Sequence, residues 1–238
     1  MFGNKLRIAL MVPCVNSVMR PELTQMAPEG IEIYETRMLM RGADKLEQLA
    51  YMAKSLPDVV ESVMDVGDVF AYGCTSGSFT KGYAFDQELA HTIQGQTGRP
   101  TVTAAGSLVK ALNKLQAKRI SLATPYLDAV NQLQIAFFKA ADIEVAQANG
   151  LNITKRGGSG LLPPEAAYDL AKQTFAQDNK IDAMVISCTN FRSVDIIARL
   201  EDELGIPVIS SNQAVMWAAL RAGEIHQSIH VYGRLMEI

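Results

Sequence analysis

Short apolar runs of strand length alternate along the chain with longer segments of helical periodicity. Eight runs, mostly of β-branched and aliphatic residues, have the composition of strands buried on both faces. They span 6–12, 31–37, 68–73, 100–105, 119–125, 143–148, 182–187 and 207–212. The longer helical patterns between them cover 46–65, 84–96, 105–116, 127–141, 163–177 and 193–204. This alternation predicts an α/β fold with parallel sheets covered by helices on both faces.

The second half of this pattern repeats the first. RIALMVP at 7–13 matches RISLATP at 119–125, and IEI at 31 matches IEV at 143, both at an offset of 112. A nearly constant offset indicates a duplicated unit of about half the chain. We therefore predict two pseudo-symmetric, four-stranded, parallel, doubly wound halves of the flavodoxin-like kind, with an active-site cleft between them. The predicted first half comprises residues 1–105 with the C-terminal segment of about 213–238, and the second comprises residues 106–212.

Two cysteines stand at equivalent points of the repeat. DVFAYGCTS (68–76) and DAMVISCTN (182–190) each carry an Asp six positions before the Cys and a Thr directly after it. Ligands of open α/β sheets bind outside the carboxyl ends of the strands, so facing halves would bring Cys74 and Cys188 into one cleft from opposite sides. Such a pair can remove a proton from one face of a carbon acid and deliver one to the other. A thiolate can also add to an electron-poor alkene and leave again after bond rotation.

The residues around these cysteines favour a bound carboxylate. Hydroxyl groups and close backbone follow each Cys, and turns of this kind bind anions. A helix that starts directly after the cysteine would also favour the thiolate form. The end of the first strand and its repeat equivalent add further polar groups. The expected substrate-binding residues are Pro13, Cys14, Asn16, Thr75, Ser76, Tyr126, Thr189 and Asn190.

Composition narrows the class of protein. With 48% hydrophobic and 20% charged residues, the chain is typical of a globular protein, and its net charge of -3 gives no reason to expect nucleic acid. No window approaches the roughly 18 apolar residues of a membrane span, and the N-terminus lacks a secretory pattern. Three widely spaced cysteines suit a reducing compartment and show no metal-ligand spacing. We expect a cytoplasmic protein with a small-molecule partner and without metal or cofactor; a homo-oligomer stays open.

The glycine-rich segment KRGGSG at 155–160 has neither the G-x-G-x-x-G spacing of a dinucleotide site nor the ending of a P-loop. We expect it to form a loop beside the cleft that could close over substrate.

Several stretches resemble the aspartate/glutamate racemase superfamily. VPCVNSVMRPEL (12–23) and TRMLM (36–40) are similar to maleate cis-trans isomerases, whose first loop carries an Asn matched here by Asn16. YGCTSGSFTKGYAF (72–85) and SLATPYLDAVN (121–131) look more like arylmalonate decarboxylases. Those enzymes hold the substrate carboxylate in a hydroxyl-rich pocket, which this resemblance assigns to Thr75, Ser76 and Tyr126.

The departures from each group guide the choice of activity. Arylmalonate decarboxylases have one catalytic cysteine, matching Cys188, and a glycine at the place of Cys74. Maleate isomerases have both cysteines, but an apolar stretch follows the first one where TSGS stands here. They also use an Asn after the sixth strand, and the nearest here is Asn152.

The resemblance therefore implies a cofactor-independent isomerase or racemase of a small carboxylic acid that uses two cysteines. The alternatives are an arylmalonate-type decarboxylase, with Cys188 as proton donor to the enediolate, and a small-molecule binding module without turnover.

Overall fold

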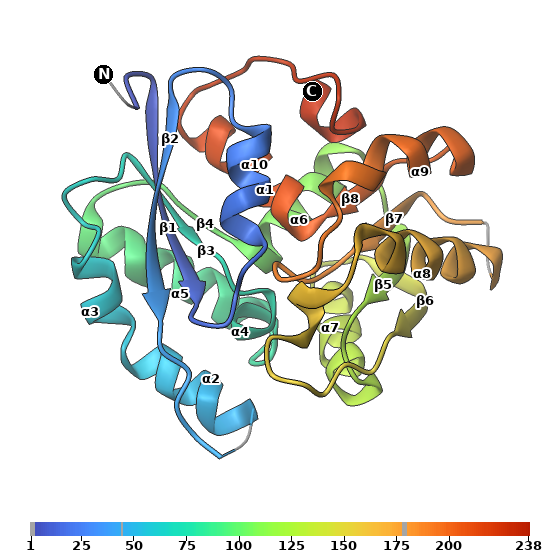
Figure 1. Cartoon of the computed structure of the whole chain (residues 1–238), viewed down its shortest axis with the longest axis horizontal. Coiled ribbons are helices and arrows are strands. Elements are labelled where there is room, and N and C mark those ends of the chain that lie inside the picture. The colour runs from blue at the N-terminus through green and yellow to red at the C-terminus, as the bar shows by residue number, and fades with distance from the viewer. Residues whose placement is uncertain (1–2, 44, 178–179) are drawn as a thin grey trace.

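The computed structural model describes residues 3–43, 45–177 and 180–238. It contains two four-stranded parallel sheets, ordered β2-β1-β3-β4 and β6-β5-β7-β8 (Figure 1). The strands are β1 (Leu6–Pro13), β2 (Ile31–Met38), β3 (Val69–Tyr72), β4 (Thr101–Thr103), β5 (Arg119–Thr124), β6 (Glu144–Gly150), β7 (Ala183–Ile186) and β8 (Val208–Ser210). All eight predicted strands are confirmed, and the two sheets share one flavodoxin-like order. The predicted duplication is therefore present in the fold.

Helices cover every stretch with a predicted helical pattern. They are α1 (Met19–Met26), α2 (Lys45–Lys54), α3 (Leu56–Glu61), α4 (Thr75–Phe79), α5 (Tyr83–Thr97), α6 (Ala104–Lys114), α7 (Asp128–Ala140), α8 (Pro164–Gln177), α9 (Ile197–Leu204) and α10 (Ser211–Ala222). Short 3-10 turns add η1 (Gly158–Leu161), η2 (Val194–Ile196) and η3 (Arg234–Glu237). None of these helices is both long and apolar enough to cross a membrane, as far as the described residues extend.

The aspartates that precede the two cysteine strands have the same structural role in both halves. Asp68 accepts a hydrogen bond from the Arg7 backbone N–H at 2.9 Å, and Asp182 accepts one from the Arg119 N–H at 2.8 Å. The Arg7 guanidinium also bonds Asp68, and this hydrogen bond lowers the pKa of the Asp68 carboxyl. Each aspartate thus ties the start of its strand to the central strand of its sheet.

The fourth strand of each sheet is shorter than its apolar run because its last residue caps the next helix. Thr103 Oγ1 accepts from the Gly106 N–H at 3.0 Å, which starts α6. Ser210 Oγ accepts from the Gln213 N–H at 3.1 Å in a capping box that starts α10. Helix N–H groups left without intrahelical partners are satisfied in this way, so strand and helix follow one another without a loop.

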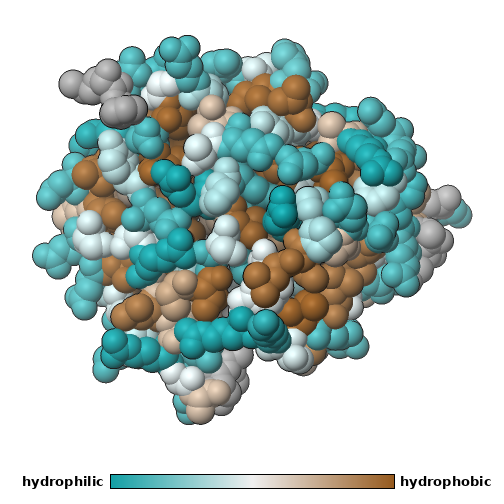
Figure 2. Space-filling view, in the orientation of Figure 1, coloured by the Kyte–Doolittle hydropathy of each residue, from teal (hydrophilic) through white to brown (hydrophobic). Residues whose placement is uncertain are grey.

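Helix α10 lies between the halves, against β3, β4, α1 and α6 (Figure 1). Residues 211–220 are buried without interruption, so this helix carries no amphipathic stripe. The division of the chain into 1–105 with 213–238, and 106–212, stays a prediction. On the face shown in Figure 2, apolar patches are separated by polar side chains.

Candidate active site

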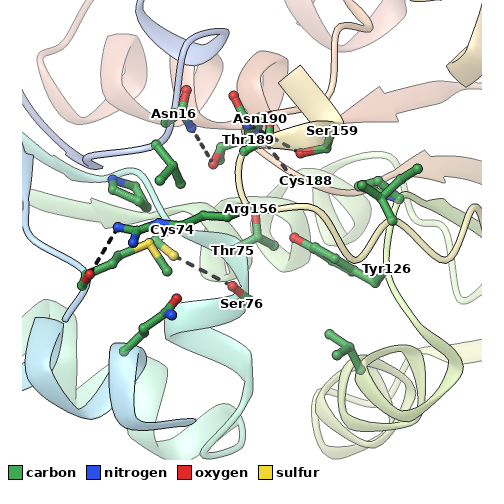
Figure 3. Close-up of a pocket in the computed structure, with 18 of the residues that line it drawn as sticks. Asn16, Cys74, Thr75, Ser76, Tyr126, Arg156, Ser159, Cys188, Thr189 and Asn190 are labelled. Atoms are coloured by element: carbon green, nitrogen blue, oxygen red, sulfur yellow. Dashed lines mark hydrogen bonds between the residues drawn. The ribbon is translucent and has the colours of Figure 1, made fainter. Parts of the chain in front are cut away.

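A pocket of about 410 Å³ opens where strands of both sheets end. Its lining follows β1, β2 and β3 of the first half and β5, β6 and β7 of the second, as expected for ligand sites of open α/β sheets. Nine predicted site residues line it, namely Pro13, Asn16, Cys74, Thr75, Ser76, Tyr126, Cys188, Thr189 and Asn190. Cys14 is not among the lining residues; its sulfur lies 3.6 Å from Arg156 Nη2. The two repeat-equivalent thiols therefore share one pocket (Figure 3).

Cys74 is the N-cap of helix α4. Its Sγ accepts from the Gly77 N–H at 3.3 Å and lies 3.8 Å from Ser76 Oγ. A Cβ at position 77 would stand 2.5 Å from the Tyr72 hydroxyl oxygen and 3.1 Å from Cys74 Sγ, so the turn requires glycine. The side chain is only 5% exposed, which places the sulfur on the floor of the pocket.

Cys188 is more accessible and sits in a different local structure. Its Sγ accepts from the Asn190 N–H at 3.4 Å, and its own N–H donates to Ser211 Oγ at 3.1 Å. The expectation that a helix starts directly after the cysteine is confirmed at Cys74 and wrong at Cys188, which is followed by a turn at residues 189–190. Backbone N–H groups nevertheless point at both sulfur atoms.

Contacts from the first half hold the turn after Cys188 out of a helix. The Glu22 carboxylate accepts from the N–H groups of Ser193 and Val194, at 2.7 and 3.1 Å. Burial raises the pKa of Glu22, against the effect of these hydrogen bonds and one from Asn212. These donors satisfy both carboxylate oxygens, so Glu22 anchors the segment after Cys188.

Tyr126 points its hydroxyl group into the pocket, toward Thr75 (Figure 3). Burial raises the pKa of Tyr126 well above its ordinary value, and the nearby Cys188 and Cys74 raise it further. The hydroxyl lies close enough to Cys188 and Thr75 for both side chains to affect this pKa. Because the raised pKa keeps the phenol neutral throughout the physiological pH range, Tyr126 can act as a hydrogen-bond donor beside both thiols.

The threonines of the two Cys-Thr pairs fasten the halves together. Thr75 Oγ1 donates to Ser211 Oγ at 3.3 Å, and Thr189 Oγ1 donates to the Gly73 carbonyl at 3.0 Å. Each hydroxyl thus donates its proton to the opposite half and can act only as a hydrogen-bond acceptor toward the pocket. The Ser76 hydroxyl lies beside Cys74 and also lines the pocket.

Asn190 also connects separate segments. Its Oδ1 accepts from the Ser17 N–H at 2.9 Å, and its Nδ2 donates to Ser159 Oγ at 3.3 Å and to the Gly157 carbonyl at 3.4 Å. The glycine-rich segment 155–160 therefore lies beside the pocket, as predicted, and contacts the residue that directly follows the second Cys-Thr pair; its closure over substrate stays a prediction.

Asn16 serves mainly as the cap of helix α1. Its Oδ1 accepts from the N–H groups of Val18 and Met19, at 3.0 and 2.9 Å, and its Nδ2 donates to Thr189 Oγ1 at 3.1 Å. One Nδ2 hydrogen remains for a ligand, so the predicted role of Asn16 in substrate binding stays a prediction.

This cap gives a stability prediction. Asn16→Ala is expected to lower the free energy of unfolding by about 1–2 kcal/mol, since two helix N–H groups lose their acceptor in a buried position. Asn16→Asp keeps both acceptors and is expected to stay closer to the parent protein. Urea unfolding of the three proteins measures the difference, and an Asn16→Ala protein as stable as the parent would mean that the cap contributes nothing.

Part of the lining was missed by sequence reasoning. The loop after β2 contributes Met40 and Ala43, helix α2 contributes Gln48, and the segment after β6 contributes Lys155 and Arg156. Residues 40–43 and 155–156 have no periodic pattern, and the pattern that contains Gln48 predicts only a helix, so the only signal was the glycine-rich run at 155–160. No Asp or Glu belongs to the pocket lining, and no cluster of three metal-ligating side chains occurs among the described residues.

Fold and site together define a duplicated α/β protein of the aspartate/glutamate racemase-like group, with one thiol from each half in a shared pocket. Within that group the chain belongs to the arylmalonate decarboxylase family, whose model matches residues 8–236.

The similar proteins of known activity include a decarboxylase and maleate isomerases. The chain is 32% identical to arylmalonate decarboxylase of Bordetella bronchiseptica over 164 residues, 68% of each chain. It superposes with a TM-score of 0.91, at 25% identity, on a cysteine-to-alanine mutant of the maleate isomerase Iso from Pseudomonas putida S16 with maleate, over 98% of this chain and 97% of that one. A cysteine-to-serine mutant of Nocardia farcinica maleate cis-trans isomerase contains a covalently bound succinylcysteine intermediate. It shares the fold at 24% identity, with a TM-score of 0.89 over 98% of both chains. The chain thus belongs to a family of enzymes whose members include isomerases and a decarboxylase.

Proposed function

We propose that the protein is a cofactor-independent isomerase or racemase of a small carboxylic acid, with Cys74 and Cys188 as its catalytic residues. The observation that supports this most directly is the entry of two repeat-equivalent thiols into one pocket from different halves. In a reaction that needs only one proton donor, the second thiol would have no chemical role.

Cis-trans isomerisation is the leading form of the proposal. Cys74, as thiolate, adds its sulfur to one alkene carbon, and the π electrons move to the neighbouring carbon and into its carboxylate. Cys188 then donates its proton to that carbon, which leaves a single bond free to rotate. After rotation the Cys188 thiolate takes the proton back, the electrons reform the double bond, and the carbon–sulfur bond to Cys74 breaks. Both thiols end in their starting states. The succinylcysteine found in the Nocardia farcinica enzyme is an intermediate of this kind.

Racemisation uses the same groups without a covalent bond. One cysteine, as thiolate, removes a proton from the carbon next to the carboxylate, and the other delivers a proton to the opposite face. The enediolate that forms in between needs hydrogen-bond donors, and Ser76 and Tyr126 lie beside the thiols to supply them.

The decarboxylase alternative is favoured by the hydroxyl-rich TSGS segment at 75–78 and by the relative from Bordetella bronchiseptica. In that reaction a malonate loses one carboxylate as CO2, its bonding electrons form an enediolate, and Cys188 supplies the proton to carbon. Cys74 would then have no chemical role, and a binding module without turnover would need neither thiol.

One assay separates these reactions. The protein is incubated in deuterated water with maleate, with D- and L-aspartate and glutamate, and with phenylmalonate, and the products are followed by NMR. We expect fumarate from maleate, or deuterium at Cα of an amino acid. Release of CO2 from phenylmalonate alone would favour the decarboxylase, and no reaction with any substrate would overturn the proposal for these acids.

A further inference from the structure

The rim of the pocket carries positive charge that the proposed reaction does not use. Lys155 and Arg156 line the pocket and are exposed, whereas Cys74, Thr75 and Ser76 lie buried at its floor. Among the described residues, the lining contains no acidic side chain, although the whole chain has a net charge of -3. A small site with two cations and no carboxylate attracts anions.

Arg156 is held in position by the opposite half. Its Nη2 donates to the Met40 carbonyl at 3.0 Å and lies 3.6 Å from Cys14 Sγ, so the side chain reaches across to the first half (Figure 3). Gly157, with φ of +71°, turns the chain directly after it, and Asn190 binds the Gly157 carbonyl at 3.4 Å. A guanidinium offers five N–H groups in a planar fork, and the described protein contacts use those of Nη2. The remaining N–H groups, on Nε and Nη1, lie on different edges of the guanidinium plane, and each can donate a single hydrogen bond to a carboxylate.

The pocket is also larger than a four-carbon diacid requires. At about 410 Å³ it lies in the range of sites for drug-sized ligands, whereas maleate has only eight non-hydrogen atoms. The neutral donors at the floor, Ser76 and Tyr126, already provide for the carboxylate next to the reacting carbon. A second anionic group would therefore find its partner nearer the solvent, at Arg156.

We propose that Arg156 is a specificity-determining residue that binds a second carboxylate at the pocket rim, so that dicarboxylates longer than four carbons are preferred over maleate. This inference rests on the proposed function for the position of the first carboxylate at the floor. The guanidinium recognises the second carboxylate as a planar anion, and its bond to Met40 keeps it oriented before the ligand arrives.

Binding of unreactive saturated diacids tests this without relying on turnover. Calorimetry at constant ionic strength gives dissociation constants for succinate, glutarate and adipate and for their monoamides, which keep the length and lose one charge. We expect adipate or glutarate to bind about tenfold to a hundredfold more tightly than its monoamide, the range for a hydrogen-bonded charge pair, and succinate to show a smaller preference.

Three variants assign the effect. Arg156→Gln should remove the preference for the diacid and leave monoamide binding unchanged, and Arg156→Lys should retain part of it as a point charge. Lys155→Gln is the matched control, with the same loss of charge at the neighbouring position, and should keep the preference within about threefold of the parent. A preference that survives in Arg156→Gln, an equal loss in Lys155→Gln, or a full preference already at succinate would overturn the inference.

Turnover measured on the same preparations separates the two proposals. A length-dependent preference that needs Arg156, without isomerisation or racemisation of any acid, would refute the proposed function alone. Isomerisation with equal binding of diacids and monoamides would refute the role of Arg156 alone.

Discussion

Replacement of either pocket cysteine by alanine is expected to abolish isomerisation or racemisation, with kcat reduced by at least about 10³. In the proposed mechanism each thiol serves a step that the other cannot perform, because Cys74 and Cys188 enter the pocket from different halves. Nucleophiles and bases that act as a unit lose nearly all activity when one member is removed. Initial rates of Cys74→Ala and Cys188→Ala, with circular dichroism to verify folding, measure the effect.

The third cysteine supplies a matched control. Cys14→Ala removes a thiol near the pocket but outside its lining, and we expect it to keep turnover within about threefold of the parent. The pattern among the variants is diagnostic. Full activity in Cys74→Ala with none in Cys188→Ala would refute the two-thiol mechanism and support the decarboxylase. Activity in both would mean that the thiols are not the reacting groups.

The elements that depend on local pattern were predictable from the sequence. Buried strands and amphipathic helices leave periodic signals, and the duplication supplied the second copy of each. The equivalence of Cys74 and Cys188 followed from the same repeat, and their approach in one pocket followed from the rule for the carboxyl ends of parallel strands. Nine of the ten proposed site residues line the pocket for this reason.

The parts that escaped prediction are fixed by contacts between distant segments. The turn after Cys188 depends on Glu22, which lies about 170 positions earlier in the chain. Its carboxylate accepts hydrogen bonds from the backbone N–H groups of Ser193 and Val194, at the start of the next helix, which would otherwise have no partner. Asn16 was expected to face substrate, but most of its hydrogen-bonding capacity caps α1, a helix that the periodicity did not reveal. Arg156 lies in a non-periodic segment whose position depends on Asn190 and Met40.

Tyr126→Phe is expected to lower kcat by about 10²–10³ while the stability of the protein stays the same. The phenol is neutral and lies beside both thiols, where it can donate to the enediolate or aci-carboxylate charge that develops in the proposed reaction. The ring packs edge-on against Phe79, with centroids 6.0 Å apart, and phenylalanine preserves this contact.

Tyr83→Phe is the matched control for the loss of a phenol, because the Tyr83 ring packs edge-on against Phe137 and does not line the pocket. It should leave kcat and the melting temperature unchanged. Since the pKa of Tyr126 is raised above the usual value of about 10, the phenol stays protonated, and the ratio of parent to Tyr126→Phe rates should be constant from about pH 6 to about pH 9. Steady-state rates over this range and thermal melts test both statements. If Tyr126→Phe has the rate of the parent, the hydroxyl has no role in catalysis. If the ratio of parent to variant rates falls with rising pH, the phenol ionises within that range and ceases to be a donor.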